Sequence, residues 1–442
     1  MRRICLTLPT NRSCSDTLSA LGEEAAYAAG TFDAEVRLLV LDSCDAAERE
    51  QHQDVLRGLP ADPRITVHHL DEERQRDFLR RVIARADAPK PDLLLDLMLP
   101  DRVSYGACTN RAFLVAAALG CASVHRRDSD SRYQSVSGAP VFPVHHELRT
   151  LGRRAADAAT AVDETALTTA AQDRRVAMVG ASFVGEPSVD IAEIQALDPA
   201  VYADIVGLWA PGHWTAEQRA ELAAESFLGA GTEPFTHDRS LLTLVDPMRV
   251  DMCNIAFHDV HERVPLPPAT DTIGSDYFLI HLVHDAALPG VLHNRDIVNF
   301  YTGERRTGPG FLAYQTRYAK FLLSMLYLHH VYERMAEAGE ALLDDRGQVR
   351  AEVIAGLVRE STGLDQAENI RRLDVLDAAY RKLGGRYAEL ADHLADRRER
   401  LLDEARRDME DFALLTENWE ALVRAARVTP VPASIHVAEP AR

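Results

Sequence analysis

The sequence predicts an α/β fold over about the first 305 residues and an α-helical region after them. Short apolar runs alternate with amphipathic stretches near the N-terminus, which is the pattern of βαβ units with a parallel sheet. Acidic residues follow the ends of the apolar runs. From Phe311 to Ala426, Leu, Ala, Glu and Arg recur at spacings of three and four, which indicates long amphipathic helices.

Apolar runs and amphipathic stretches alternate clearly from residue 4 to residue 84. Strands are predicted at Ile4–Leu8, Glu35–Leu41 and Ile65–Leu70, and helices at Thr17–Ala29 and Glu73–Ala84. The second strand is a continuous apolar run, which is typical of a parallel strand covered on both faces. These segments therefore predict the core of a parallel sheet.

The stretch from Gly106 to Tyr133 is the first candidate site. Apolar residues at helical spacing predict a helix at Asn110–Leu119, and Gly120 suits its C-terminus. A short strand is predicted at Cys121–His125, and the acidic triplet Asp128-Ser129-Asp130 follows it. Ligands of open α/β sheets bind beyond the carboxyl ends of the strands, and carboxylate oxygens suit Mg²⁺ or Mn²⁺. A metal site is therefore predicted at this triplet.

Later segments are less uniform. Residues Pro91–Leu99 fit a strand or a helix, Pro140–Thr169 is predicted to be mainly helical after Pro143, and Arg175–Phe183 is predicted to be a strand. Breaks between the C-terminal helices are expected near 344–346 and 384–385. The tail at 429–442 contains three prolines and is expected to be disordered.

Composition restricts the class of protein. The 442 residues include 49 basic and 68 acidic side chains, a net charge of −19, which argues against nucleic acid or an anionic membrane as partner. The six cysteines form no CxxC pair, so reduced thiols in the cytoplasm are expected. No signal peptide and no run of about 20 apolar residues is evident.

Several motifs occur in a characteristic order. They are the LPTNR run that ends the first strand and contains Pro9, Thr10, Asn11 and Arg12; Asp42 after the second strand; Gly106, Asn110, Ala117 and Gly120 before Asp128-Ser129-Asp130; GSDYF at 274–278; and His293 within VLHNR. In this order they resemble the nucleotide-sugar-dependent glycosyltransferases of the GT-A fold. The triplet with a later histidine is similar to glucosyl-3-phosphoglycerate and mannosylglycerate synthases, and to family 2-like enzymes.

The resemblance covers roughly residues 1–305. It implies a Rossmann-like mixed sheet flanked by helices, with a nucleotide-binding half at about 1–135 and an acceptor-side half at about 136–305. The helical region at 306–428 has no counterpart in it. The implied activity is a hexosyltransferase-type, metal-dependent transfer from a nucleotide-sugar to a small soluble acceptor, with a place in specialised metabolism.

The resemblance also assigns roles to individual residues. Asp276 is the implied catalytic residue, and Mn²⁺ or Mg²⁺ is the implied cofactor, with Asp128, Asp130 and His293 as its ligands. The implied contacts to the nucleotide-sugar come from eight residues: Pro9, Thr10, Asn11, Arg12, Asp42, Asn110, Asp128 and Ser129.

Simpler interpretations stand beside these. The triplet could be a solvated turn, Asp276 a helix-capping carboxylate and His293 an ordinary hydrogen-bonding group. Arg126 and Arg127 are expected in surface ion pairs, with diphosphate binding as the alternative.

The alternatives for the whole chain are a sugar-phosphate nucleotidyltransferase and a non-catalytic scaffold. The stereochemistry stays open, since the triplet with His293 resembles retaining enzymes whereas Asp276 as a base suits inversion. The C-terminal helices are expected to form a bundle over the catalytic domain or a homodimer interface.

Overall fold

The computed structural model describes residues 2–301 and 303–432 and has the predicted α/β class. In the described residues, one large mixed sheet contains nine strands. Their spatial order is β3 (Ile65–Asp71), β2 (Ala34–Asp42), β1 (Arg2–Thr10), β4 (Val124–Arg127), β12 (Asn254–Phe257), β9 (Met178–Gly180), β13 (Gly290–His293), β11 (Ser240–Thr243) and β8 (Glu164–Thr165).

The first four strands of this order are parallel. The chain moves outward from β1 to β2 and β3, through α1 (Ser15–Phe32) and α2 (Ala46–Arg57), and then returns to place β4 on the other side of β1. The order of strands thus reverses between β1 and β4. Such a switch point opens a crevice at the carboxyl ends of the two strands, which is where open α/β sheets bind ligands.

Local sequence explains the helices that return to the sheet. Asp71 caps α3 (Glu72–Ala86) by accepting from the Arg74 amide, and Ser104 caps α5 (Tyr105–Ala118) by accepting from the Ala107 amide. The ambiguous segment near residue 95 is a helix, α4 (Pro91–Met98). Its proline occupies the first turn, where no backbone donor is needed, and its leucines are largely buried.

The second part of the sheet is mixed. Strand β12 is antiparallel to β4 and to β9, and Asn254 pairs with Arg127. Residues that precede β12 therefore lie at the same edge of the sheet as residues that follow β4. Two smaller sheets complete the strands: β10 (Phe183–Gly185), β14 (Ile297–Asn299) and β5 (Ser131–Tyr133) in one, and β6 (Ser135–Val136) and β7 (Ala139–Pro140) in the other.

The segment predicted to be helical up to Thr169 is helical only in part. Helix α6 (Val144–Thr150) and helix α7 (Ala155–Ala158) are short, and β8 follows them. Alanine content alone does not sustain a helix when neighbouring elements provide no continuous apolar face. The remaining helices before residue 300 are α8 (Ala192–Leu197), α9 (Pro199–Val206), α10 (Ala216–Glu225), α11 (Val260–Arg263) and α12 (Phe278–Asp285).

The expectation of surface ion pairs at Arg126 and Arg127 is wrong, because all four residues of β4 are buried. Arg127 donates to both carboxylate oxygens of Glu24, at 3.0 and 2.8 Å, and to Glu147 at 3.0 Å. A buried charge is tolerated when ion pairs and hydrogen bonds satisfy it. The strand is therefore buried along its whole length despite its two arginines.

The region after residue 306 is helical, with breaks at both predicted places. Its helices are α13 (Gly308–Ala338), α14 (Ala351–Ser361), α15 (Ala367–Leu383), α16 (Arg386–Asp396) and α17 (Arg398–Ala426). Short 3-10 helices occupy Ala159–Ala161, Thr169–Ala171, Gly207–Trp209, Pro247–Arg249, Gly303–Arg306 and Gly339–Leu342.

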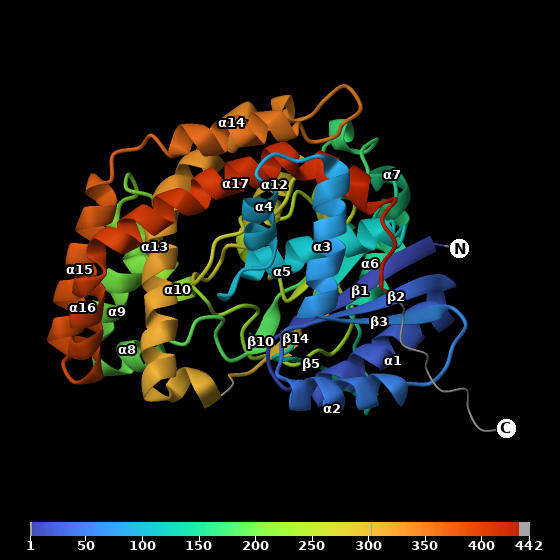
Figure 1. Cartoon of the computed structure of the whole chain (residues 1–442), viewed down its shortest axis with the longest axis horizontal. Coiled ribbons are helices and arrows are strands. Elements are labelled where there is room, and N and C mark those ends of the chain that lie inside the picture. The colour runs from blue at the N-terminus through green and yellow to red at the C-terminus, as the bar shows by residue number, and fades with distance from the viewer. Residues whose placement is uncertain (1, 302, 433–442) are drawn as a thin grey trace.

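These C-terminal helices pack on the sheet region. Figure 1 shows α13 on the left, β1–β3 on the right and α17 running across the top. The buried Trp419 on α17 donates its indole N–H to the His261 carbonyl at 2.9 Å, and Phe412 packs edge-on against Phe278 with ring centroids 4.8 Å apart. Both parts of the chain thus contribute to one buried apolar cluster. The domain boundary at 305 stays a prediction.

Within the described ranges, no helix combines the length and the apolar character that a membrane crossing requires. Of the tail that was expected to be disordered, residues 433–442 lie outside the described part of the chain.

Candidate functional site

A cavity of about 470 Å³ lies at the switch point of the sheet. Its lining includes residues 9–12, which are the end of β1 and the turn after it, and the acidic triplet after β4, residues 128–130. Asp276, from the loop before α12, lines the same cavity. The structure therefore brings together three of the segments that the sequence singled out, although they are far apart along the chain.

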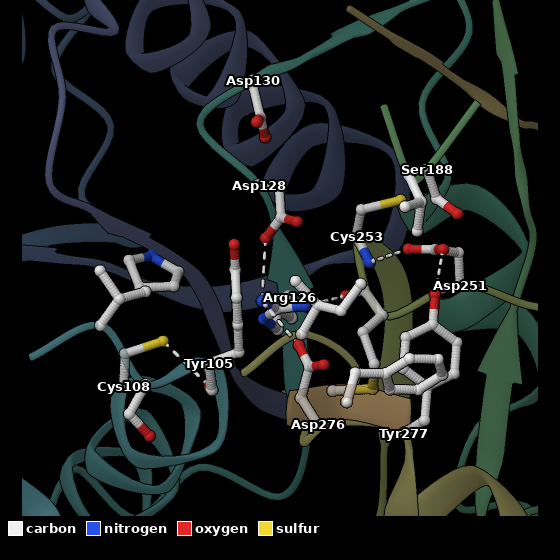
Figure 2. Close-up of a pocket in the computed structure, with 18 of the residues that line it drawn as sticks. Tyr105, Cys108, Arg126, Asp128, Asp130, Ser188, Asp251, Cys253, Asp276 and Tyr277 are labelled. Atoms are coloured by element: carbon white, nitrogen blue, oxygen red, sulfur yellow. Dashed lines mark hydrogen bonds and ion pairs between the residues drawn. The ribbon is translucent and has the colours of Figure 1, made fainter. Parts of the chain in front are cut away.

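Arg126 occupies the centre of this arrangement. Its guanidinium lies 3.0 Å from the Asp128 carboxylate and 3.2 Å from that of Asp276, and it donates to the Met252 carbonyl at 2.6 Å. The side chain is only 3% exposed. Figure 2 shows the two carboxylates approaching Arg126 from opposite sides. One buried cation thus fixes the positions of both acidic groups.

The carboxylates outnumber the cation between them. Burial raises the pKa of Asp128 to about 7, and the nearby charges of Asp130, Asp276 and Asp251 act in the same direction, while Arg126 opposes them. Burial also raises the pKa of Asp276. Such shifts mark negative charge that is incompletely neutralised, and they concentrate at functional sites. The oxygen donors and the excess of negative charge both fit a bound divalent cation.

Asp130 is held by two arginines. One carboxylate oxygen accepts from Arg12 at 2.8 Å and from Arg305 at 3.2 Å. Arg12 follows β1, whereas Arg305 lies in the 3-10 helix Gly303–Arg306, just before α13. The segment that leads into the C-terminal helices therefore contributes a charged side chain to the cavity, which the sequence did not predict.

The loop that carries Asp276 is anchored by helix α5. The Asn110 amide donates to the Leu266 carbonyl and accepts from the Leu266 N–H, both at 2.8 Å. Gly106 allows the close approach, since a Cβ at this position would lie 1.9 Å from the Pro267 carbonyl oxygen. Asn110 is buried and does not line the cavity. The structure thus gives Asn110 a positioning contact where the resemblance implied a nucleotide contact.

Asp42 also lies outside the cavity lining, although its neighbours Leu41 and Ser43 belong to it. The buried Asp42 carboxylate lies 2.8 Å from His52 Nδ1 and 2.7 Å from His69 Nε2, and it accepts from the Cys44 amide at 2.9 Å. These contacts connect the end of β2 to α2 and to β3.

Potential metal-ligating atoms of Asp42, Cys44 and His52 lie within 4.8 Å of one another, the one such group of three among the described residues. Hydrogen bonds already use the imidazole, because His52 Nε2 accepts from the Cys14 amide at 3.1 Å while Nδ1 faces Asp42. The group is therefore accounted for as a buried hydrogen-bond network.

The structure does not bring His293 to the acidic triplet. It ends β13, which is three strand positions from β4, or about 14 Å at the usual strand spacing. The buried imidazole stacks on His146 with ring centroids 5.1 Å apart and accepts from the Arg295 amide at 3.2 Å. Burial lowers its pKa well below the usual value. His293 does not line the cavity.

A further cavity residue, Asp251, was missed from the sequence. Asp251 accepts from the Cys253 amide at 2.9 Å and from the Tyr277 hydroxyl, as drawn in Figure 2. Asp251 precedes β12, an antiparallel strand that begins at the edge where β4 ends. Ligands are expected beyond the carboxyl ends of parallel strands. Asp251 lies at the start of an antiparallel strand, so it could be placed at this edge only once the direction of β12 was known.

Comparisons with known proteins give remote likenesses. No curated protein matches the chain. One similar solved structure is the mannosyltransferase PcManGT from Pyrobaculum calidifontis in complex with GDP-Man and Mn²⁺, at 13% identity and a TM-score of 0.34, covering 94% of this chain and 88% of that one. Another is core-mannan synthase A (CmsA/Ktr4) from Aspergillus fumigatus in its Mn/GDP form, at 7% identity and a TM-score of 0.23, covering 58% of this chain and 59% of that one. Neither TM-score reaches 0.5, so these two likenesses do not establish a shared function.

A family match covers nearly the whole sequence. The profile described as "Family of unknown function (DUF6271)" matches residues 2–435, and the chain belongs to that family.

Proposed function

We propose that the chain is a metal-dependent glycosyltransferase of the GT-A type that moves a hexosyl group from a nucleotide-sugar to a hydroxyl acceptor. The observation that carries the proposal is the convergence of three segments on one cavity. The turn after β1 and the acidic triplet after β4 flank the switch point of the sheet, and Asp276 faces the same space. This is the arrangement that a reaction between a phosphorylated donor and a positioned acceptor requires.

The donor would lie along the β1 side of the cavity. Leu41 and Ser43 at the end of β2, with Pro9 to Asn11, offer a mainly uncharged surface for a nucleoside. Arg12 and Arg305 stand beside Asp130 and supply the positive charge that a diphosphate needs. Ser129 lies between the two acidic residues of the triplet and lines the cavity as well.

Asp128 and Asp130 are the proposed metal ligands. A divalent cation at these carboxylates would offset the negative charge that develops on the departing diphosphate. His293 is not included, because the structure places it three strands away. An oxygen-only protein ligand set is compatible with both Mg²⁺ and Mn²⁺.

Each bond that breaks or forms in the proposed transfer, and the proton that is released, can be assigned to a group. The bond between the anomeric carbon and the phosphate oxygen breaks, and a bond from that carbon to the acceptor oxygen forms. The acceptor hydroxyl loses its proton to the Asp276 carboxylate, and a nucleoside diphosphate departs. The raised pKa of Asp276 makes it a stronger base than an exposed aspartate, and Arg126 holds it in place.

The first test is a thermal-shift panel of UDP, GDP, ADP and CDP with and without Mn²⁺. We expect stabilisation by one of them that depends on the metal, since a ligand at 100 times its Kd stabilises the folded state by about 2.7 kcal/mol. Asp128→Asn should abolish the metal-dependent part. Asp77→Asn, an exposed aspartate on α3, is the matched control and should behave like the wild type.

Absence of stabilisation by every nucleotide would overturn the proposal. If a nucleotide binds, the matching nucleotide-sugars are assayed for release of nucleoside diphosphate. Asp276→Asn should then lower turnover at least tenfold and leave nucleotide affinity unchanged. The anomeric configuration of the product, read by NMR, decides between inversion, which Asp276 as base favours, and retention.

A further inference from the structure

The wall of the cavity opposite the β1 side is apolar. Trp209, Phe227, Phe321, Met325, Leu328 and Tyr332 line it. Four of these residues are on α13, and Figure 1 shows that helix on the side of the molecule away from β1–β3. The cavity therefore has a charged part at the triplet and a second part that the proposed donor chemistry does not use.

This wall is built from rings in mutual contact. Trp209 stacks on Phe227 with centroids 5.2 Å apart and an interplanar angle of 13°, and it meets the Phe321 ring at 5.7 Å. Phe321 in turn packs against Gly274, where a Cβ would come within 2.9 Å of its ring. Gly274 is two residues before Asp276. The aromatic surface thus begins directly beside the loop that carries the proposed base.

A histidine contributes a polar atom to the same wall. The His281 ring lies flat on Tyr332, with centroids 3.8 Å apart and an interplanar angle of 11°. Burial lowers the pKa of His281 to about 3, so the ring is neutral at physiological pH. In the described part of the chain its ring nitrogens make no hydrogen bond, although His281 lines the cavity. A neutral ring of this kind can accept from or donate to one hydroxyl group of a bound molecule.

The rim of the apolar part is also apolar. Met248 lines the cavity and is nevertheless 52% exposed. Methionine side chains adapt to aromatic ligands and are used at binding surfaces. A sugar or a phosphorylated acceptor would leave its polar groups unpaired against this wall, and an anion would also be repelled by Asp251 and Asp276.

We infer that the acceptor of the proposed transfer is an uncharged aromatic alcohol, whose ring system lies between the Trp209–Phe227 stack and the His281–Tyr332 stack. Its hydroxyl group then reaches Asp276. This inference rests on the proposed function for the role of the ligand as acceptor, whereas the aromatic binding site itself can be tested alone. Flat rings offset-stacked or edge-on against aromatic side chains are the favoured geometry for such a ligand.

The test measures binding of 2-naphthol to the wild-type protein by calorimetry, without nucleotide and without metal. We expect binding of 2-naphthol and none of glucose or glycerol 3-phosphate at the same concentration. Binding of 1-octanol that equals or exceeds that of 2-naphthol would overturn the aromatic assignment, and so would binding of none of the compounds.

Substitutions at the rim locate the site. Met248→Arg should weaken 2-naphthol binding at least tenfold, because the charged side chain would have to lose water beside the ligand. Leu197→Arg is the matched control, since Leu197 is 56% exposed and lies outside the cavity lining. Both variants should keep the wild-type thermal midpoint. An equal effect of the two substitutions would overturn the location.

The two proposals fail separately. If nucleoside diphosphates with Mn²⁺ stabilise the protein and 2-naphthol does not bind, the acceptor inference falls while the glycosyltransferase proposal stands. If 2-naphthol binds at the Met248 site and no nucleoside diphosphate stabilises the protein, the proposed function is wrong while the aromatic binding site is supported.

Discussion

The guanidinium group of Arg126 lies 3.2 Å from the carboxylate of Asp276, although 150 positions separate the two residues in the chain. The same guanidinium pairs with Asp128, so one buried arginine connects the end of β4 to the loop before α12. Removal of either carboxylate leaves Arg126 one carboxylate partner, whereas removal of Arg126 leaves the buried carboxylate of Asp276 and the partly buried carboxylate of Asp128 without their shared cation. The consequences for stability are therefore asymmetric.

Arg126→Met should destabilise the protein by about 3–5 kcal/mol at pH 7.5, the usual cost when one partner of a buried ion pair is removed. Both carboxyl groups have raised pKa values in the folded protein. Their neutral forms favour folding, so the variant should be less impaired at pH 5 and should lose stability as the pH rises through 7. Urea unfolding at the two pH values measures this.

Arg57→Met, which removes an exposed ion pair on α2, is the control for Arg126→Met and should change stability by less than about 1 kcal/mol. An Arg126→Met variant as stable as this control at pH 7.5 would show that the two carboxylates do not depend on the arginine.

Asn110→Leu should cost about 3 kcal/mol, because the Leu266 N–H and carbonyl would remain buried without partners. Nucleotide affinity of the folded variant should fall only modestly, since Asn110 does not line the cavity. Chemical unfolding and calorimetric titration separate the two effects. If the Asn110→Leu variant has normal stability but binds nucleotide much more weakly, the result would instead support the direct contact between Asn110 and the nucleotide that the resemblance implied.

The stability of the protein should fall as the pH drops below 6.5. Burial lowers the pKa of His261 to about 3, and His281 and His329 are shifted to the same value. A histidine with a lowered folded pKa binds its proton in the unfolded chain first, so stability is full above about 6.5 and is lost on acidification.

His261→Phe tests this in one residue, because the ring packs against Phe113 with centroids 5.0 Å apart and phenylalanine has a similar shape. The loss of stability between pH 6.5 and 5.5 should shrink by about 1 kcal/mol. His213→Phe, at an exposed position, should leave the pH profile unchanged. If His261→Phe and His213→Phe show the same dependence of stability on pH, the loss of stability on acidification does not come from His261.

A fragment of residues 1–305 should not unfold cooperatively. Phe412 and Trp419 on α17 are buried against Phe278 and the His261 carbonyl, so truncation would expose a large part of the apolar cluster. Near-ultraviolet circular dichroism during urea titration measures this, with the full chain as the reference. A fragment with a cooperative transition would support the domain boundary at 305 that the sequence predicts.

Local periodicity was sufficient for much of the fold. Strands β1 to β3 and helices α1 and α3 occur where the apolar runs and amphipathic stretches predict them, with ends that differ by a few residues. The C-terminal helices and their two breaks were also predictable. In each case the signal is contained within one element, because side-chain spacing and capping residues act over a few positions.

Tertiary structure decided everything that depends on partners distant in sequence. The sequence predicted Arg127 at the surface. In the structure it is buried, because Glu24 and Glu147 on two other helices provide carboxylates that pair with it. His293 resembled a metal ligand, but the order of strands separates it from Asp130.

By itself the sequence determined the α/β class, the helical C-terminal region and the acidic triplet after β4. Only the tertiary structure decided that Arg126 joins Asp128 to Asp276, that Asn110 anchors the loop of Asp276, and that α13 lines the cavity with rings. The physical reason is that burial and charge pairing depend on which strands become neighbours, and the spacing of residues within one segment does not specify this.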